Sequence, residues 1–284
     1  MQGASGDWRA VSAPSAGTGH WVPHKVKTEQ YSVHADLEDR HWWFTGRRRI
    51  CSALIRRLLP PSKGIVILDA GCGTGGNIAA LAGDYSCIGM DPSPEAIALA
   101  RQRYPGIRFE QGRIPEELAP LVPAADLLLL MDVLEHVPDD TALLAPIVAE
   151  ARQGSHLLIT VPADMKLWSP HDVSFGHFRR YDRPLLEKAW SGLPVTPVMV
   201  SYYNHRLYPL ALLARTLSRF RGKAWGDAGT DLALPAPPVN RLMEWIFSGE
   251  RNRLMKLMEK DVKEGYPSGV SLIAVLRREA SHAR

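Results

Sequence analysis

The chain has 284 residues, of which 45% are hydrophobic and 23% charged, as is usual for a soluble globular protein. The formal net charge of +4 permits an anionic partner without requiring one. The beginning of the chain lacks the pattern of a signal peptide, and no apolar run reaches the roughly 18 residues of a membrane-spanning helix. Three cysteines without metal-ligand spacing favour a reducing compartment. We therefore expect a cytoplasmic protein.

The first 62 residues divide into a leader and a helical segment. Residues 1–27 are rich in Gly, Ser, Ala and Pro without a period, which predicts a flexible leader. Residues 28–62 have helical spacing, which ends at two prolines, and predict an N-terminal helical cap. Inside this segment three aromatic residues from Trp42 precede three arginines from Arg47. They would cover a ligand or, with about equal weight, pack the aromatics on the core and leave the arginines in water.

A buried strand then stops in a glycine-rich turn. Residues 65–68 are apolar and mostly β-branched, as in a parallel strand covered on both faces. Asp69 follows, and the glycines fit both the dinucleotide pattern G-x-G-x-x-G and the pattern G-x-G-x-G. Glycines let the backbone approach a ligand closely, and the helix that begins at Asn77 would present free N–H groups to the same crevice. The turn indicates a nucleotide-like ligand.

Four further strand patterns alternate with helices. Residues 86–91 predict a second strand that ends in Asp91, 22 positions after Asp69, where an acid can bind both hydroxyls of a ribose. Residues 107–110, 125–133 and 155–161 predict the third, fourth and fifth strands. Such alternation predicts a parallel, doubly wound α/β sheet.

The alternation breaks after the fifth strand. Residues 162–182 form a long polar and aromatic connection, which we interpret as a substrate loop. A helix over 183–190, a strand over 195–202, helical stretches over 204–220 and 239–260 and a strand over 269–276 follow. The linker 222–238 separates the two helical stretches. The expected domains are the leader 1–27, the cap 28–62, the core 63–203, a helical lid 204–265, and the last strand with its tail, 266–284.

This order of parts resembles the class I S-adenosylmethionine-dependent methyltransferases. The resemblance rests on residues 68–75, 90–93 and 131–136, read as Leu-Asp-Ala-Gly-Cys-Gly-Thr-Gly, Met-Asp-Pro-Ser and Met-Asp-Val-Leu-Glu-His. Residues 42–49, 176–181 and 267–272 look like a bacterial small-molecule branch of that superfamily. The resemblance implies a seven-stranded, mostly parallel, Rossmann-like sheet with helical additions at both ends.

The resemblance also implies cofactor-binding residues for S-adenosylmethionine. Asp69 and the glycine-rich turn would hold the methionine end, and Asp91 would bind the ribose hydroxyls. Gly112 and Arg113 would flank the adenine, and Met131 and Asp132 would line the other side of the cofactor. The cofactor-binding residues of this core are therefore Asp69, Gly71, Gly73, Gly75, Asp91, Pro92, Gly112, Arg113, Met131 and Asp132. Arg47 is assigned to the cofactor carboxylate by analogy and because arginine pairs with carboxylates in a bidentate way. Arg113 departs from the Asp or Asn of many relatives, and a guanidinium has no acceptor for the adenine amine.

The chemistry of methyl transfer to a hydroxyl or amine calls for a base, and histidine suits that role near neutral pH. The candidates are His136, His171 and His177, although His136 would also fit a role in shaping the cofactor pocket. A metal site from His171, Asp172 and His177 matches no established ligand spacing, and no metal is expected. The predicted substrate-binding residues, suited to an anionic or aromatic small molecule, are Trp43, Trp168, Asp172, Arg180 and Tyr181.

The remaining predictions concern partners and alternatives. Residues 207–221 are apolar with basic residues at the end, and would cover the pocket or form a homodimer contact in preference to lying on a membrane surface. The expected activity is methyl transfer to a small molecule, most favourably at oxygen. The alternatives are RNA methylation, which the mild charge does not favour, an NAD(P)-dependent oxidoreductase, and a binder of the cofactor without catalysis.

Overall fold

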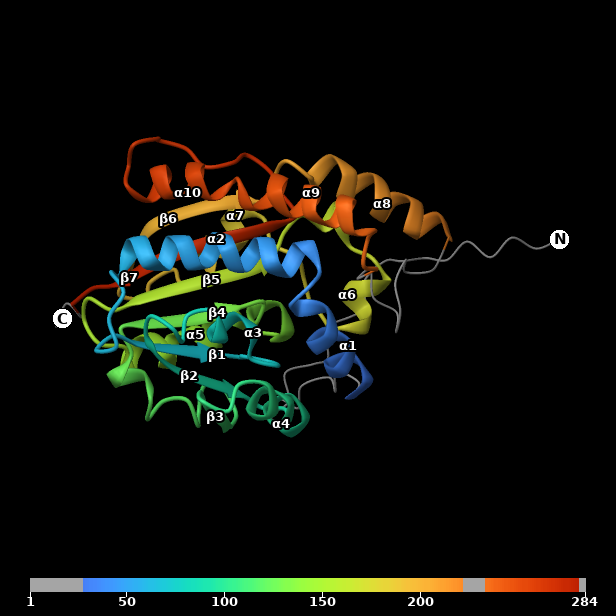
Figure 1. The fold of residues 1–284 in the computed structure, drawn as a ribbon. Helices are drawn as coiled ribbons and strands as arrows, with labels where there is room; N and C mark the ends of the chain where they lie inside the picture. Colours follow the sequence, from blue (N-terminus) through green and yellow to red (C-terminus); the bar gives the residue numbers. More distant parts are fainter. Residues whose placement is uncertain (1–27, 222–232, 281–284) are drawn as a thin grey trace.

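The computed structural model describes residues 28–221 and 233–280 (Figure 1). The expected leader 1–27, most of the expected linker 222–238 and the last four residues lie outside the described residues. Seven strands form one sheet in the order β3-β2-β1-β4-β5-β7-β6, in which β7 is antiparallel to both neighbours and the other neighbouring pairs are parallel. This confirms the predicted doubly wound, mostly parallel sheet. The strands are β1 Val66–Ala70, β2 Ser86–Asp91, β3 Arg108–Gln111, β4 Leu127–Met131, β5 His156–Pro162, β6 Val195–Tyr203 and β7 Ser271–Arg278.

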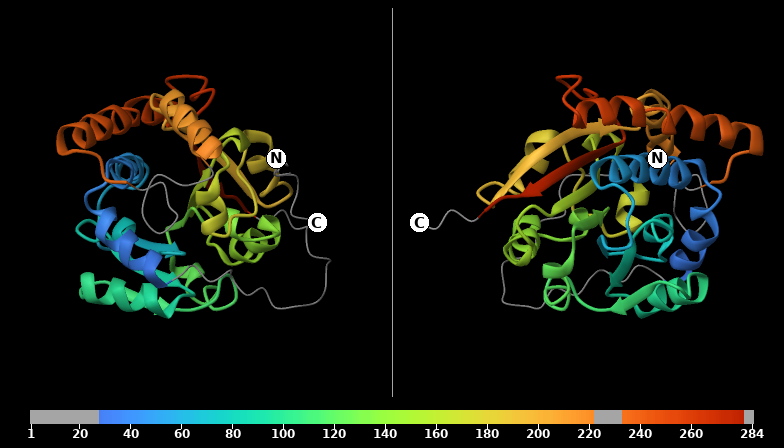
Figure 2. Two further views of the ribbon diagram at one scale, coloured as in Figure 1. Left: turned by 90° about the vertical axis from the view of Figure 1, so that its right-hand side faces the viewer. Right: turned by 60° about the vertical axis from the view of Figure 1, so that its left-hand side comes forward.

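Helices cover both faces of this sheet (Figures 1 and 2). They are α1 Thr28–Glu38, α2 Trp42–Leu58, α3 Gly76–Ala79, α4 Pro94–Arg103, α5 Asp140–Glu150, α6 Pro170–Ser174, α7 Arg183–Lys188, α8 Tyr208–Arg221, α9 Pro237–Ser248 and α10 Arg251–Met258. Among the described residues, no helix is both long enough and apolar enough to cross a membrane.

The apolar sequence of β4 explains its central place. Leu128 and Leu130 belong to the core beneath α5 and α7, whereas Leu127 and Leu129 belong to the core beneath α2 and α10. Neighbouring residues of a strand point to opposite faces of the sheet. All four side chains are fully buried because helices cover both of these faces. A strand between two helical layers therefore has to be apolar throughout.

Two helical predictions differ from the structure. The stretch expected over 239–260 is two helices, α9 and α10, which meet at Gly249, and the carboxylate of Glu250 accepts a hydrogen bond from the backbone N–H of Arg206 (2.8 Å). The substrate loop 162–182 contains α6, where Ser169 and Asp172 form a reciprocal capping box. The sequence Ser-Pro-His-Asp at 169–172 carries that signal.

Candidate active site

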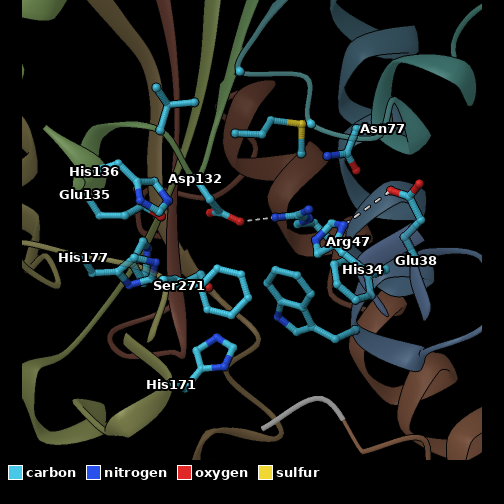
Figure 3. A pocket seen from close by; sticks show the side chains of 18 of the residues that line it. His34, Glu38, Arg47, Asn77, Asp132, Glu135, His136, His171, His177 and Ser271 are labelled. Carbon is cyan, nitrogen blue, oxygen red and sulfur yellow. Dashed lines mark hydrogen bonds and ion pairs between the residues drawn. The ribbon is translucent and has the colours of Figure 1, made fainter. Parts of the chain in front are cut away.

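A pocket of about 1050 Å³ opens at the carboxyl ends of the parallel strands (Figure 3). The glycine-rich turn after β1 and the tip of β2 form one end of the pocket. The turn after β4 and the loop around α6 form the other end, while α1, α2 and α8 cover it. Pockets for small ligands have volumes of roughly 300–1000 Å³, so this one is at the large end of that range.

The glycine-rich turn presents backbone to the pocket. Gly71 and Gly73 have positive φ angles of 82° and 53°, which side-chain-bearing residues rarely adopt. A Cβ on Gly71 would lie 2.7 Å from Cγ2 of Val133, whereas a Cβ on Gly73 would meet no atom within 4 Å. Gly71 therefore allows close packing with the end of β4, and Gly73 leaves open space where the turn faces the pocket.

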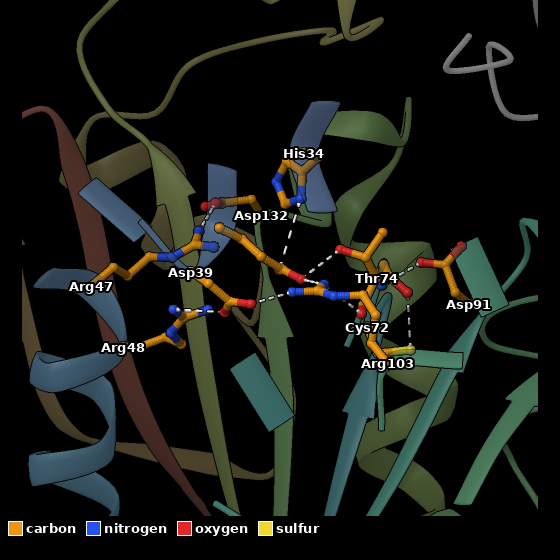
Figure 4. Close-up of polar contacts among 11 residues, drawn as sticks. His34, Asp39, Arg47, Arg48, Cys72, Thr74, Asp91, Arg103 and Asp132 are labelled. Atoms are coloured by element: carbon orange, nitrogen blue, oxygen red, sulfur yellow. Dashed lines mark hydrogen bonds and ion pairs between the residues drawn. The ribbon is translucent and has the colours of Figure 1, made fainter. Parts of the chain in front are cut away.

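Asp91 at the tip of β2 is held by the backbone around it. Its carboxylate accepts hydrogen bonds from the N–H groups of Gly73 and Ser93, each at 2.9 Å (Figure 4). Burial raises the pKa of Asp91, and these two hydrogen bonds oppose the rise. Asp91 lines the pocket with lone pairs remaining for further donors.

Asp69 lies behind the turn and does not line the pocket. It is on β1, opposite Gly89 of β2, and is completely buried, with no hydrogen-bond partner for either carboxylate oxygen. Burial and the nearby charge of Asp91 raise the pKa of Asp69 to about 7. A buried carboxyl without partners is unusual and indicates a place where a ligand, or groups that a ligand orders, supply hydrogen bonds.

Arg47 of α2 crosses the middle of the pocket to Asp132, which follows β4 (Figure 3). The guanidinium is buried and lies 4.2 Å from the ring centroid of Trp43, while its Nε has no hydrogen-bond partner. Asp132 has a φ of 59° and accepts a hydrogen bond from Oγ1 of Thr160 (3.1 Å). Strained backbone of this kind concentrates at functional sites.

The α1 helix closes the pocket above the glycine-rich turn (Figure 4). Glu38 is buried, accepts a hydrogen bond from Oγ1 of Thr74 (3.0 Å) and pairs with Arg103. Nδ1 of His34 lies 3.9 Å from the same carboxylate. Neither His34 nor Glu38 was predicted as a site residue, although a histidine and a glutamate four positions apart lie on one helical face.

The opposite end of the pocket is built from imidazoles and carboxyls (Figure 3). His136 follows β4 in a 3-10 turn, and its ring centroid lies 4.8 Å from that of His177. Nδ1 of His177 is 3.0 Å from Oδ1 of Asp172, to which Nε of Arg180 donates at 2.8 Å. Glu135 is fully buried beside them, and neither of its carboxylate oxygens has a hydrogen-bond partner.

The titratable groups of this end differ in charge. Burial and the neighbouring His177 lower the pKa of His136 to about 3, and burial together with the charge of Arg215 lowers the pKa of His171 well below its usual value. Burial raises the pKa of Glu135. Burial would also raise the pKa of Asp172, but the hydrogen bond with His177 and the charge of Arg180 hold it below its usual value.

Most of the residues predicted from the sequence lie together around the pocket. Those that line it are Arg47, Gly71, Gly73, Asp91, Pro92, Arg113, Met131, Asp132, His136, His171, His177, Trp43 and Arg180. Those that do not are Asp69, Gly75, Gly112, Trp168, Asp172 and Tyr181.

Two of the predicted substrate contacts lie behind the pocket instead of in its wall. Tyr181 is fully buried in the core under α5 and α7, where its hydroxyl donates to Asp140 (2.9 Å). Asp172 is fully buried and reaches the pocket only through His177 and Arg180. The side chain of Arg113 does line the pocket but is 64% exposed beside Glu117.

The helix α8 lines the pocket through Leu210, Ala211 and Ala214, and Leu207 just before it does the same. This is the geometry that the pocket-cover interpretation of 207–221 requires. Leu213 and Leu217 of the same helix are exposed. A membrane-surface or homodimer contact through them stays a prediction.

Comparison with known proteins places this site in context. The sequence matches the methyltransferase-domain family over residues 43–209. It is 34% identical over 130 residues to the trans-aconitate 2-methyltransferase of Deinococcus radiodurans, covering 44% of this chain and 49% of that protein. It is 33% identical over 141 residues to the ubiquinone biosynthesis O-methyltransferase of Methylocella silvestris, covering 47% and 50%. The chain thus spans about half the length of the curated relatives that it matches.

Solved structures share the fold at low sequence identity. The plantazolicin methyltransferase BamL, in complex with a substrate analogue and SAH, aligns with a TM-score of 0.53 and 10% identity over 89% of this chain and 91% of that chain. Phosphoethanolamine N-methyltransferase 2 of Haemonchus contortus aligns with a TM-score of 0.50 and 14% identity over 81% and 52%. At these identities the likeness shows the arrangement of strands and helices alone.

Proposed function

The chain belongs to the methyltransferase-domain family, and from that premise we propose that it transfers a methyl group from S-adenosylmethionine to an oxygen atom of a small molecule. The observation that carries this proposal is a pocket that joins a glycine-rich, carboxylate-bearing end to an end made of imidazoles. Two adjoining subsites are what a transfer between two bound molecules requires, because the reaction depends mainly on alignment of the reacting groups.

The glycine-rich end fits S-adenosylmethionine. The open space at Gly73 would admit the cofactor, and the remaining lone pairs of Asp91 would accept from its ribose hydroxyls. Asp69 would support the turn from behind, where its carboxyl oxygens have no hydrogen-bond partner. Arg47 would pair with the carboxylate of the cofactor. When bound, S-adenosylmethionine supplies an electrophilic methyl group on a sulfonium sulfur.

The imidazole end suits an acceptor with an acidic hydroxyl or carboxylate. Arg180 lines the pocket and would attract a negative charge, while Trp43 offers an aromatic face. His177 is oriented by Asp172 through Nδ1, so its Nε2 would take a proton from an acceptor hydroxyl. The names of the relatives agree with such acceptors: trans-aconitate is a carboxylate, and the ubiquinone relatives are O-methyltransferases.

Calorimetry tests the cofactor half of the proposal. We expect S-adenosylhomocysteine to bind the full-length protein and NADH not to bind. Binding of NADH without binding of S-adenosylhomocysteine would overturn the proposal in favour of an oxidoreductase.

Methyl-labelled S-adenosylmethionine tests the transfer. We expect label to appear in a member of a panel of carboxylates and catechols, attached at oxygen by mass spectrometry. The His177→Ala variant should lower turnover about 100-fold or more, while leaving affinity for S-adenosylhomocysteine nearly unchanged. His156→Ala is the matched control, because His156 begins β5 and is not among the residues lining the pocket. A methyl group found on nitrogen, sulfur or carbon would contradict the choice of oxygen.

A further inference from the structure

Three potential metal ligands gather at the imidazole end of the pocket. Glu135 and His136 come from the 3-10 turn after β4, and His177 comes from the loop after α6 (Figure 3). One ligand atom from each residue lies within 4.8 Å of those of the other two. Ligand atoms around one zinc ion are about 3.4 Å apart, given bond lengths of about 2.1 Å, so small side-chain rotations would bring the three together.

The carboxylate of Glu135 is the group of this cluster whose hydrogen-bonding capacity is not satisfied. Its side chain is completely buried, and neither Oε1 nor Oε2 has a hydrogen-bond partner. Most buried polar groups in proteins are hydrogen-bonded, and an unsatisfied one calls for a specific explanation such as a bound ion. A cation between Glu135 and the two imidazoles would supply that partner.

One of the two imidazoles, that of His177, is already oriented by a hydrogen bond on the side away from the cluster. His177 holds Asp172 through Nδ1, and Asp172 is itself fixed by Nε of Arg180 and by the backbone N–H of Ser169 (2.9 Å). His136 lies against His177, with 4.8 Å between their ring centroids. Metal-binding histidines almost always donate their second ring N–H to a carboxylate or a backbone carbonyl, which fixes the ring and its tautomer.

We propose that Glu135, His136 and His177 bind a divalent transition-metal ion, and that zinc is the ion that their two nitrogens and one carboxylate match best. Three protein ligands leave a position open to the pocket, as in catalytic zinc sites. This differs from the sequence-based expectation of no metal, because Asp172 lies behind His177 as its orienting partner and Glu135 takes the carboxylate position.

The consequence for catalysis rests on the proposed function. An acceptor oxygen would occupy the open position, and the positive charge of the ion would lower its pKa. His177 would then act as a ligand, and the proton of the acceptor would leave to water instead of to Nε2. The ion pair between Asp172 and Arg180 offsets part of the repulsion between Arg180 and the ion.

Metal titration of the full-length protein tests the site directly. After dialysis against a chelator, we expect Zn²⁺ to bind with one equivalent by calorimetry, and Co²⁺ to give the visible absorption of a low-symmetry site with nitrogen ligands. Glu135→Gln and His136→Gln should each weaken Zn²⁺ binding at least tenfold. His171→Asn is the matched control, a histidine of the same pocket outside the trio, and should leave Zn²⁺ affinity within about threefold.

Affinity for S-adenosylhomocysteine, measured on the same samples, separates this inference from the proposed function. Retained S-adenosylhomocysteine binding shows that each variant is folded. Absence of Zn²⁺ binding in a protein that binds S-adenosylhomocysteine would overturn the metal site alone. Equal Zn²⁺ affinity in Glu135→Gln, His136→Gln and the unmodified protein would overturn it too. A protein that binds Zn²⁺ through the trio but not S-adenosylhomocysteine would instead overturn the proposed cofactor.

Discussion

The two ends of the pocket are built in different ways. At the glycine-rich end, backbone makes the shape: Gly71 and Gly73 have positive φ, and N–H groups of the turn hold Asp91. At the imidazole end, side chains from distant segments make it, since His136 follows β4 and His177 follows α6. The first is a local structure that one short segment encodes, whereas the second forms only when the sheet and the loop come together.

The buried carboxyls of Asp69 and Asp172 also differ, in their hydrogen-bond partners and in their pKa values. Asp69 has no hydrogen-bond partner and a raised pKa, whereas Asp172 has His177 and Arg180 and a lowered pKa. Near neutral pH, the carboxyl of Asp69 therefore destabilises the folded protein, whereas the carboxyl of Asp172 stabilises it. Each end therefore has one buried carboxyl without a hydrogen-bond partner, Asp69 at the glycine-rich end and Glu135 at the imidazole end, whereas Asp172 is satisfied by His177 and Arg180.

Asp172→Asn should have the largest effect on stability. It leaves the buried charge of Arg180 without its carboxylate, and breaking a buried pair costs about 3–5 kcal/mol. Urea unfolding at pH 7 measures this loss. Asp139→Asn is the control, because Asp139 caps α5 and asparagine caps a helix equally well. A change below about 1 kcal/mol in Asp172→Asn would contradict the stabilising role.

Asp69→Asn should change stability in the opposite direction. The folded protein raises the pKa of Asp69 from 3.8 to about 7, so it holds a proton that the unfolded chain has lost. The stabilising contribution of the protonated form is complete below pH 3.8 and is lost as the pH rises to about 7. At pH 8 we expect the variant to be more stable than the unmodified protein by on the order of 4 kcal/mol.

Urea unfolding of both proteins at pH 4.5 and pH 8 checks the sign. The advantage of the Asp69→Asn variant should shrink at pH 4.5. If its stability relative to the unmodified protein does not depend on pH, the raised pKa is wrong. Affinity for S-adenosylhomocysteine should fall in this variant, which separates stability from binding.

Gly73→Ala should weaken S-adenosylhomocysteine binding about 100-fold, or about 2.7 kcal/mol, because its methyl group fills space at the glycine-rich end. Gly154→Ala is a close control: Gly154 also has a positive φ, 81°, and open space around it, yet it lies between α5 and β5 and is not among the pocket-lining residues. Both variants should lose similar stability, about 1–2 kcal/mol. Equal binding by the two would show that Gly73 does not face the ligand.

Arg113→Ala should have the smallest effect, less than about threefold on S-adenosylhomocysteine affinity by calorimetry. Its guanidinium has no acceptor for the adenine amine and is 64% exposed. Glu117→Ala, which removes its ion-pair partner, is the comparison variant. A tenfold loss in Arg113→Ala would restore it as a cofactor contact.

The sequence predicted the sheet well because each strand and turn has a local signature. The apolar run of β4 and the glycines after β1 are visible in a few consecutive residues. Glu38 and Glu135 were not predicted as site residues, because the spacing of His34 and Glu38 and the motif at 131–136 do not show that the fold buries these two glutamates. Tyr181 was assigned to the pocket, but the structure packs it in the core. Loop residues have no regular period that shows which side chains face the core.

One small contact links the beginning of the pocket cover to a much later part of the chain. Asn240 of α9 accepts from the backbone N–H of Trp42 (2.9 Å) and donates to the carbonyl of Arg40 (2.8 Å). Residues 39–41 connect α1 to α2, which begins at Trp42. Asn240 therefore ties the connection between α1 and α2 to a helix that begins almost 200 positions later in the chain, and it adds to the contacts that Glu38 makes with Thr74 and Arg103 at the end of α1.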